Sequence, residues 1–470
     1  LFFQLMVSRI FLLVNLILLS AYIWLNRYRI WTRLRDFLIE PIMPYSLAIT
    51  RILFFSYLVV VYVGMMFHYG PRIGQMNTQS LPGLGWLIDI LPLSSEYYTV
   101  MGCLGVVFSI FSAVGYRTRT FMILNSITIF YVVAAPNFYG KLWHQQLPIW
   151  ISWILAASPC ADVLSVDAKF RNSDSVNGNY SFHLRMIWLQ FGLIYFWAGF
   201  YKLWDSGFDW ALNNTVVNLI TIEWFEHYDK IPAFRIDRYP LLIKSGALLT
   251  IIFELLYPFL LLNRHTRSVP IVGGLLMHNL LGKFLYIGFF FLLQVFYMVF
   301  IPWNWFIQRI WPRVYKGPLS LPQRINLWTP AFLVPIIVVS SNAFCGLFKI
   351  NSYPFSVYPV YTDVVPDSVA FLDYRIMDHG LESVDFRLEA RKTRFRWEDY
   401  SRIEYALIRD HIATGTLDTA GVVTMWQRWK MGVPSLKEVD SVEVFVRWRY
   451  VSPDSTRSPI ESEYLMTIVD

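Results

Sequence analysis

Long apolar stretches recur along most of the chain, and their lengths predict helices that cross a membrane. A membrane-spanning helix needs about 20 mostly apolar residues. About ten stretches approach that length, at 9–26, 45–66, 98–115, 120–138, 144–164, 186–204, 241–263, 268–287, 289–306 and 329–348. The sequence therefore predicts an α-helical integral membrane protein with about ten transmembrane helices.

The pattern changes after residue 349, where charged residues become frequent and long apolar runs stop. Val442–Tyr450 alternates like a half-buried strand, Glu461–Val469 is similar, and 391–413 has helical character. The tail predicts a small soluble α+β or β domain. The first apolar stretch has no small-residue cleavage site after it, which favours an anchor helix over a signal peptide. We expect three parts: an anchor helix with a basic cytoplasmic segment at 1–43, a membrane domain at 44–349, and an extracytoplasmic domain at 350–470.

Composition supports this division. The 470 residues are 56% hydrophobic and 18% aromatic, and 16% are charged. A soluble protein averages about 25% charged residues. This composition excludes disordered, collagenous and coiled-coil proteins. Three widely spaced cysteines exclude a secreted disulfide scaffold.

The charge distribution predicts which loops face the cytoplasm. The chain carries 40 basic and 33 acidic residues, a net charge of +7. With ten spans, most basic loop residues fall on one side: Arg27, Arg29, Arg33, Arg35, Arg117, Arg119, Lys169, Arg171, Arg185, Arg264, Arg267, Arg309, Arg313, Lys316 and Arg324. By the positive-inside rule this side is cytoplasmic. The N-terminus and the tail then lie outside, as in a bacterial inner-membrane protein facing the periplasm. The excess charge gives no reason to invoke nucleic acid.

Ionisable residues inside apolar stretches cost free energy, so each invites a functional question. Lys202 lies in the aromatic run 195–204. Desolvation favours the neutral amine, which can act as a general base. The structural alternative is a lysine that snorkels to the interface beside an aromatic belt.

Five other in-span residues are candidates. His144 and His278 can donate hydrogen bonds to oxygen atoms or take up protons, or they can bridge helices. Their spacing does not favour a metal site. Arg51 and Glu254 have opposite charges, and a buried pair between them would relieve the cost of both. Lys283 either snorkels or lines the same cavity as His278. The sequence contains no phosphate-binding loop, nucleophile elbow or dinucleotide fingerprint.

Four ordered motifs resemble the transmembrane domain shared by vitamin K-dependent gamma-carboxylases and their bacterial relatives, the horizontally transferred transmembrane (HTTM) family. The first is Ser46–Phe54, similar to S-L-A-x-x-R. The second is His144 followed by Ser165-Val166-Asp167. The third and sharpest runs from Gln190 into Tyr195–Leu203, similar to Q-x(4)-Y-F-x-A-G-x-K-K-L. The fourth is Glu254 and Pro258, then His278 and Ile287–Phe289. The resemblance covers about 44–306, more than half the chain.

This resemblance implies a reduced, vitamin K-like quinone as cosubstrate and a lyase or epoxidase type of carboxylation or oxygenation. Lys202 matches the second lysine of the family's K-K pair, the base that acts on the hydroquinone, whereas Tyr201 replaces the first. His144 and His278 match histidines placed near the quinone oxygens. We therefore take Lys202, His144 and His278 as candidate catalytic residues. Candidate cofactor-binding residues are Arg51, Gln190, Tyr195, Tyr201 and Trp204, and no metal is expected.

The short tail departs from the carboxylases that act on clotting proteins, which carry a long region that grips a propeptide. A peptide or protein substrate on the outer side is therefore an open expectation, beside contact with membrane lipids. The alternative function is non-catalytic: a membrane maturation, immunity or scaffold partner that docks through its external tail. A transporter ranks last, because the in-span charges do not line one helix.

Overall fold

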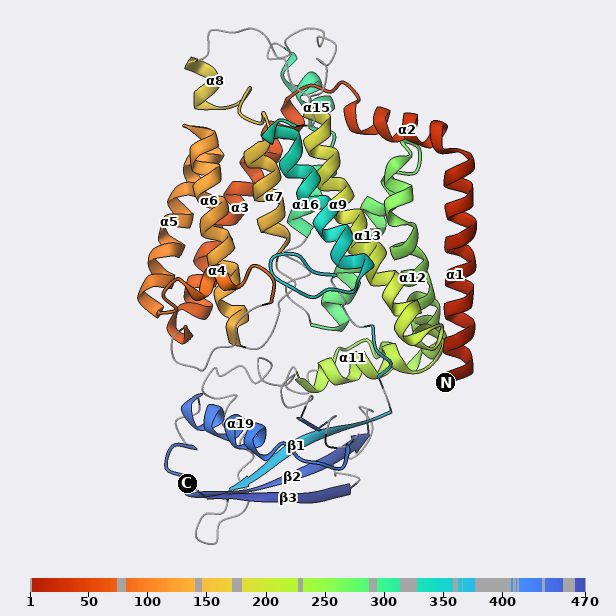
Figure 1. The fold of residues 1–470 in the computed structure, drawn as a ribbon, viewed down its shortest axis with the longest axis vertical. Coiled ribbons are helices and arrows are strands. Elements are labelled where there is room, and N and C mark those ends of the chain that lie inside the picture. Colours follow the sequence, from red (N-terminus) through yellow and green to blue (C-terminus); the bar gives the residue numbers. More distant parts are fainter. Residues whose placement is uncertain are drawn as a thin grey trace.

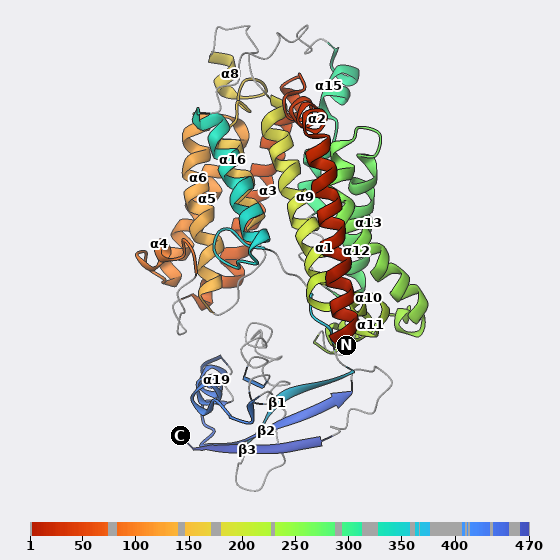
Figure 2. The same cartoon turned by 45° about the vertical axis from the view of Figure 1, so that its right-hand side comes forward.

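In the computed structural model the chain folds into a helical bundle with a small sheet at one end (Figures 1 and 2). The structure describes residues 2–73, 82–139, 146–170, 180–226, 231–286, 294–312, 328–357, 362–365, 367–376, 407–408, 411, 414–432, 436–450 and 461–469.

Among these residues, six helices are long and apolar enough to cross a membrane. They are Met6–Leu25 within α1 (Phe2–Leu25), α3 (Tyr45–Tyr69), α5 (Ser95–Val114), Thr118–Phe138, which includes α6 (Thr118–Ala134), α12 (Pro240–Leu262) and α16 (Pro330–Leu347). The chain is therefore a multi-pass membrane protein, and these helices contact lipid.

The other predicted spans are shorter or less apolar. They correspond to α7 (Leu147–Ala157), α9 (Tyr180–Tyr201) and α13 (Ser268–Phe284). The stretch 289–306 was predicted as one helix, and that is wrong over its described part. A 3₁₀ segment, Gln294–Phe300, precedes α15 (Trp303–Ile310), and Pro302 lies between them. Proline lacks the N–H that a continuous helix needs there. The total of ten spans stays a prediction.

The two ends of the bundle differ in what they carry (Figure 1). One end holds α2 (Arg27–Ile39), α8 (Val166–Phe170) and α15. The N-terminus, α11 (Thr215–Glu226) and the sheet lie at the other end, with α4 (Trp86–Asp89) on the same side of the bundle. The arginine-rich α2 therefore lies at the end opposite the tail, the grouping that the charge pattern predicted.

The tail forms a three-stranded antiparallel sheet in the order β1 (Ser368–Ile376), β2 (Ser441–Tyr450), β3 (Glu461–Val469). The two strands predicted from alternation are confirmed. Helix α19 (Thr419–Gly432) covers one face, and Trp426 and Trp429 pack there against Val442 and Val444. Most of the helix predicted at 391–413 lies outside the described residues.

Candidate functional site

Two glycines let α9 and α12 approach closely and so place the candidate site. A Cβ atom at Gly199 would lie 2.8 Å from the Glu254 Cβ, and one at Gly192 would lie 3.0 Å from the Pro258 Cβ. Small residues at such contacts allow membrane helices to pack backbone against backbone. This packing brings Glu254, in the middle of α12, to the end of α9.

Lys202 meets Glu254 at this contact. Lys202 begins a π-helical turn, Lys202–Ser206, which follows α9 directly. Its Nζ donates to both carboxylate oxygens of Glu254 at 2.8 Å, and the two residues are only 4% and 5% exposed. The ammonium also lies 5.1 Å from the ring centroid of Trp210, in α10 (Asp209–Leu212). Lys202 is thus buried in protein and paired, which excludes the snorkelling alternative.

Segments from both ends of the chain hold the π-helical turn. In α1, the Arg9 Nε donates to the Trp204 carbonyl at 3.0 Å, and its guanidinium lies 5.3 Å from the Trp204 ring centroid. After α16, the Lys349 Nζ donates to both carboxylate oxygens of Asp205 at 2.7 Å. The Ser206 hydroxyl donates to the Thr362 carbonyl. The turn that carries Lys202 is therefore braced by the N-terminal helix and by the start of the tail.

A second polar cluster lies further along the interface of α9 and α12. The Tyr195 hydroxyl lies 2.6 Å from the His278 Nε2 and 2.5 Å from the Tyr297 hydroxyl. The Tyr195 ring stacks on Tyr257 at a centroid distance of 4.0 Å. Gly274 makes room, because a Cβ there would lie 1.9 Å from the Tyr297 hydroxyl. These four side chains are buried and form a hydrogen-bonded aromatic cluster around an imidazole.

The Lys202–Glu254 pair and the Tyr195 cluster are neighbours but do not form a single site. Tyr195 precedes Lys202 by seven residues on the same helix, about 10 Å along its axis. Glu254 precedes Tyr257 by about one turn of α12. His278 therefore hydrogen-bonds Tyr195, not Lys202. His144 lies outside the described residues.

Arg51 belongs to a different part of the molecule, so the expected pair with Glu254 is wrong. Its guanidinium donates to the carbonyls of Cys160 at 2.8 Å, Leu164 at 2.5 Å and Ala113 at 3.4 Å. Lys202 takes Glu254 instead, because α12 packs against α9 there. Arg51 therefore joins α3 to the last turn of α5 and to the loop between α7 and α8.

The neighbouring Ser165-Val166-Asp167 motif is also structural. The Asp167 carboxylate accepts from the Arg117 and Thr118 backbone N–H groups, each at 2.8 Å, and from the Thr118 hydroxyl at 2.7 Å. It thereby caps the N-terminus of α6. The family-like motif thus holds the turn between α5 and α6.

The other predicted residues differ in surroundings. Gln190 is fully buried, and neither its amide nitrogen nor its oxygen has a hydrogen-bond partner among the described residues. The Tyr201 hydroxyl donates to the Gly346 carbonyl at 2.7 Å, which joins α9 to α16. Trp204 stacks on Phe200 at 5.8 Å between ring centroids. Lys283 is exposed on α13 and does not share the His278 cluster.

Sequence reasoning missed several members of the two clusters. Glu254 was noticed but assigned to the wrong cation, and Tyr257, Tyr297, Trp210 and Arg9 were not singled out. An arginine within the first apolar stretch was a usable signal, because such charges need a partner. In the part of the chain that the structure describes, no group of three His, Cys, Asp or Glu side chains is arranged to hold a metal ion.

Comparisons with known proteins agree with the sequence motifs. A family model described as the HTTM domain matches residues 39–305, more than half of the chain. No curated protein and no solved structure matches the chain. The match begins at the last residue of α2 and ends before α16, so Arg9 and Lys349 lie outside it. The chain belongs to the HTTM domain family.

Proposed function

We propose that the protein is a membrane enzyme of the gamma-carboxylase type, in which Lys202 serves as a base toward a quinol-type, lipid-soluble cosubstrate. The observation that carries this proposal is the buried ion pair of Lys202 and Glu254 at a π-helical turn. π-Helical turns occur frequently at functional sites. Ionisable residues inside membrane segments are rare, and they mark substrate, ion or proton sites.

Glu254 gives the lysine a way to become a base. Moving one proton from Nζ to the carboxylate turns a charged pair into a neutral amine and a neutral acid, without changing the net charge of the site. Both hydrogen bonds are 2.8 Å long, so this transfer needs no movement of the backbone. The neutral amine then accepts a proton from an acidic hydroxyl held beside it.

Buried polar residues further along the same helix interface suit a reduced quinone. Its chemistry, when bound, would be to give up a hydroxyl proton and reduce dioxygen. Tyr195, His278 and Tyr297 offer uncharged donors and acceptors to ring oxygens. The buried Gln190 amide offers a further donor and acceptor that no described residue uses. We assign these four residues to binding and orientation, and we keep Tyr201 and Trp204 as part of the wall that shields Lys202 from water.

The second substrate would be a peptide or another molecule that reaches the site from the tail side, which we propose is the extracytoplasmic side. The proposed route from the tail side rests on the Lys349–Asp205 and Ser206–Thr362 contacts, which tie the start of the tail to the Lys202 turn. A substrate held by the tail domain would thus lie near the proposed base. Carboxylation and oxygenation both remain compatible with this arrangement.

The test is quinol oxidation by the purified protein in lipid nanodiscs. Lys202→Ala is expected to abolish turnover, whereas Lys283→Ala, which removes an exposed lysine from α13, is expected to retain it. Lys202→Ala leaves Glu254 buried alone, so Lys202→Met with Glu254→Gln serves as a second variant that keeps the site uncharged. Turnover that survives in both Lys202 variants rules out the base role.

A further inference from the structure

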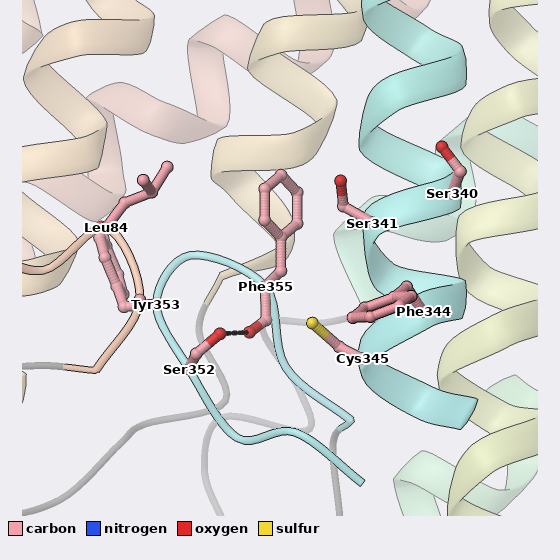
Figure 3. Close-up of a pocket in the computed structure, with 9 residues that line it drawn as sticks. Leu84, Ser340, Ser341, Phe344, Cys345, Ser352, Tyr353 and Phe355 are labelled. Atoms are coloured by element: carbon pink, nitrogen blue, oxygen red, sulfur yellow. Dashed lines mark hydrogen bonds between the residues drawn. The ribbon is translucent and has the colours of Figure 1, made fainter. Parts of the chain in front are cut away.

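A cavity of about 380 Å³ lies between the last turns of α16 and the chain that follows it (Figure 3). Ser341 and Cys345 of α16 line one side, and Tyr353 and Phe355 line the other. Leu84, from the segment before α4, contributes to the Tyr353 side. The volume is within the usual range of small-molecule sites, about 300–1,000 Å³. Lys202 and His278 are not among the lining residues, so this is a separate site.

Backbone hydrogen bonds fix the walls of the cavity. The Leu84 N–H donates to the Tyr353 carbonyl at 2.8 Å, and the Tyr353 N–H donates to the Pro82 carbonyl at 3.0 Å. Gly83 has a positive φ of 77°, and a Cβ there would lie 2.8 Å from the Tyr353 carbonyl oxygen. The Trp150 indole donates to the Pro354 carbonyl at 2.9 Å. Two separate parts of the chain, the segment 82–84 and α7, thus hold the loop in place, which makes the cavity preformed.

The lining is polar in places but carries no charged side chain. The hydroxyls of Ser340, Ser341 and Ser352 and the thiol of Cys345 supply polar side-chain atoms, together with backbone carbonyls. The nearby cation Lys349 is already bound to Asp205. An anionic head group would therefore lose its water without gaining a counter-charge, which is unfavourable. The chemistry favours an uncharged ligand.

The rim of the cavity is apolar, and the side that carries Phe344 belongs to the membrane-spanning helix α16. Phe344 is 55% exposed and Leu84 is 40% exposed, and both line the cavity. Ile337 and Leu347, also on α16, are 47% and 64% exposed. Within a candidate span, such exposed side chains contact lipid. The cavity therefore opens where hydrocarbon chains reach it.

From these observations we propose that the cavity binds a neutral-headed lipid, with its uncharged polar head among the hydroxyls and carbonyls and its chain along Phe344 and Leu84. The site also has a route to the rest of the molecule. Gly346, next to Cys345, accepts a hydrogen bond from Tyr201, and a Cβ at Gly346 would lie 1.9 Å from the Trp197 indole nitrogen. The bound lipid thus contacts the last turn of α16, and the same turn contacts Tyr201, the residue before Lys202.

The native cysteines provide the test. In nanodiscs of phosphatidylglycerol, the rate of N-ethylmaleimide labelling at Cys345 is measured by peptide mass spectrometry as dioleoylglycerol is added. A ligand at ten times its dissociation constant leaves about one site in eleven free, so labelling is expected to slow by about tenfold. Dioleoyl phosphatidic acid has the same chains with an anionic head and is expected to leave the rate unchanged. Cys103, exposed on α5, is the internal control.

The experiment is repeated with a short-chain isoprenoid quinone in place of dioleoylglycerol. Both lipids have an uncharged polar head group, so the comparison shows whether the site prefers a glyceride or a quinone. Slowing by either neutral lipid supports the proposal, and the stronger of the two identifies the preferred head group. Equal slowing by phosphatidic acid, or slowing that also affects Cys103, overturns it. So does an unchanged Cys345 rate with both neutral lipids.

Variants of α16 complete the test. Ser341→Phe fills the cavity and is expected to abolish the lipid dependence of Cys345 labelling. Ile337→Ala shortens an exposed side chain of the same helix that does not line the cavity, and is expected to change nothing. If Ser341→Phe does not fold, Ser341→Val provides a smaller filling with a weaker effect. Lys202→Ala is expected to keep the full lipid protection, so a failure of the base role and a failure of this site are distinguishable.

Discussion

Arg51 and Lys202 lie at opposite ends of the bundle, and the protein neutralises these two buried cations in different ways. Arg51, in α3, donates to the backbone carbonyls of Cys160, Ala113 and Leu164. Lys202, at the end of α9, donates to the carboxylate of Glu254. Both side chains are nearly inaccessible to water.

The difference separates scaffold from chemistry. Carbonyl oxygens fix a guanidinium in place but cannot take its proton, and arginine stays charged in proteins. A carboxylate facing a lysine can exchange a proton with it, and lysine readily changes its protonation state when it is buried. Arg51 is therefore expected to stabilise the fold alone, whereas Lys202 with Glu254 is expected to stabilise it and also to react.

Removing one member of the Lys202–Glu254 pair should have the largest effect on stability. Glu254→Leu leaves a buried ammonium without a counter-charge and is expected to lower the free energy of unfolding by about 3–5 kcal/mol. The double variant Lys202→Met, Glu254→Leu should recover most of this loss, because buried pairs can be replaced by apolar groups at little cost. Unfolding in mixed micelles of mild and denaturing detergent measures both values. If the double variant is as unstable as the single one, the loss does not come from an unpaired Lys202 ammonium, and the prediction is wrong.

Arg51→Met should follow, with a loss of about 3 kcal/mol, the low end of the range for three carbonyls that lose a charged donor at about 1–3 kcal/mol each. This variant also tests which cation Glu254 serves. If Arg51 and Glu254 act separately, the effects of Arg51→Met and Glu254→Leu add to within about 0.5 kcal/mol. A coupling energy well above that value would show that Arg51 and Glu254 interact, as the sequence suggested, and would contradict the distinction between the two cations.

That mistaken pair shows where sequence reasoning stops. The apolar stretches located most of the membrane helices, and the alternation at Val442–Tyr450 located β2, because both signals are local. The choice between Arg51 and Lys202 as the partner of Glu254 is not local. It depends on which helices pack together, which Gly192 and Gly199 decide by their contacts with α12.

The Tyr195 cluster was hidden for a similar reason. Tyr297 lies in a stretch predicted as a uniform helix, and its 3₁₀ geometry brings the hydroxyl to Tyr195 and into the space that Gly274 leaves. Hydropathy does not distinguish a 3₁₀ segment from an α-helix of the same composition. His278 was recognisable as a polar residue in a span, but its partner was not.

Asp167 tests whether the end of the bundle that contains Arg51 has only a structural role. Asp167→Ala removes the cap of α6 and is expected to cost about 1–2 kcal/mol, the range of strong N-caps. Quinol oxidation per folded molecule should not change, since Asp167 contacts the turn near Arg51 and not the Lys202 turn. Lys169→Ala, on the same short helix α8, is the matched control. A specific loss of turnover in Asp167→Ala would place this end of the bundle in the reaction.

Arg9 has the smallest expected effect on stability and the most specific effect on turnover. Arg9→Met removes one hydrogen bond to the Trp204 carbonyl and one cation–π contact, together about 1 kcal/mol. These contacts brace the turn that carries Lys202. The turnover number of the folded protein should therefore fall, although the free energy of unfolding changes little. Asn15→Ala is the matched control, since Asn15, on the same helix, donates to the Phe11 carbonyl within α1 itself. If both variants keep full turnover, α1 is an anchor alone, and reactivity at Lys202 depends on Glu254 without help from the N-terminal helix.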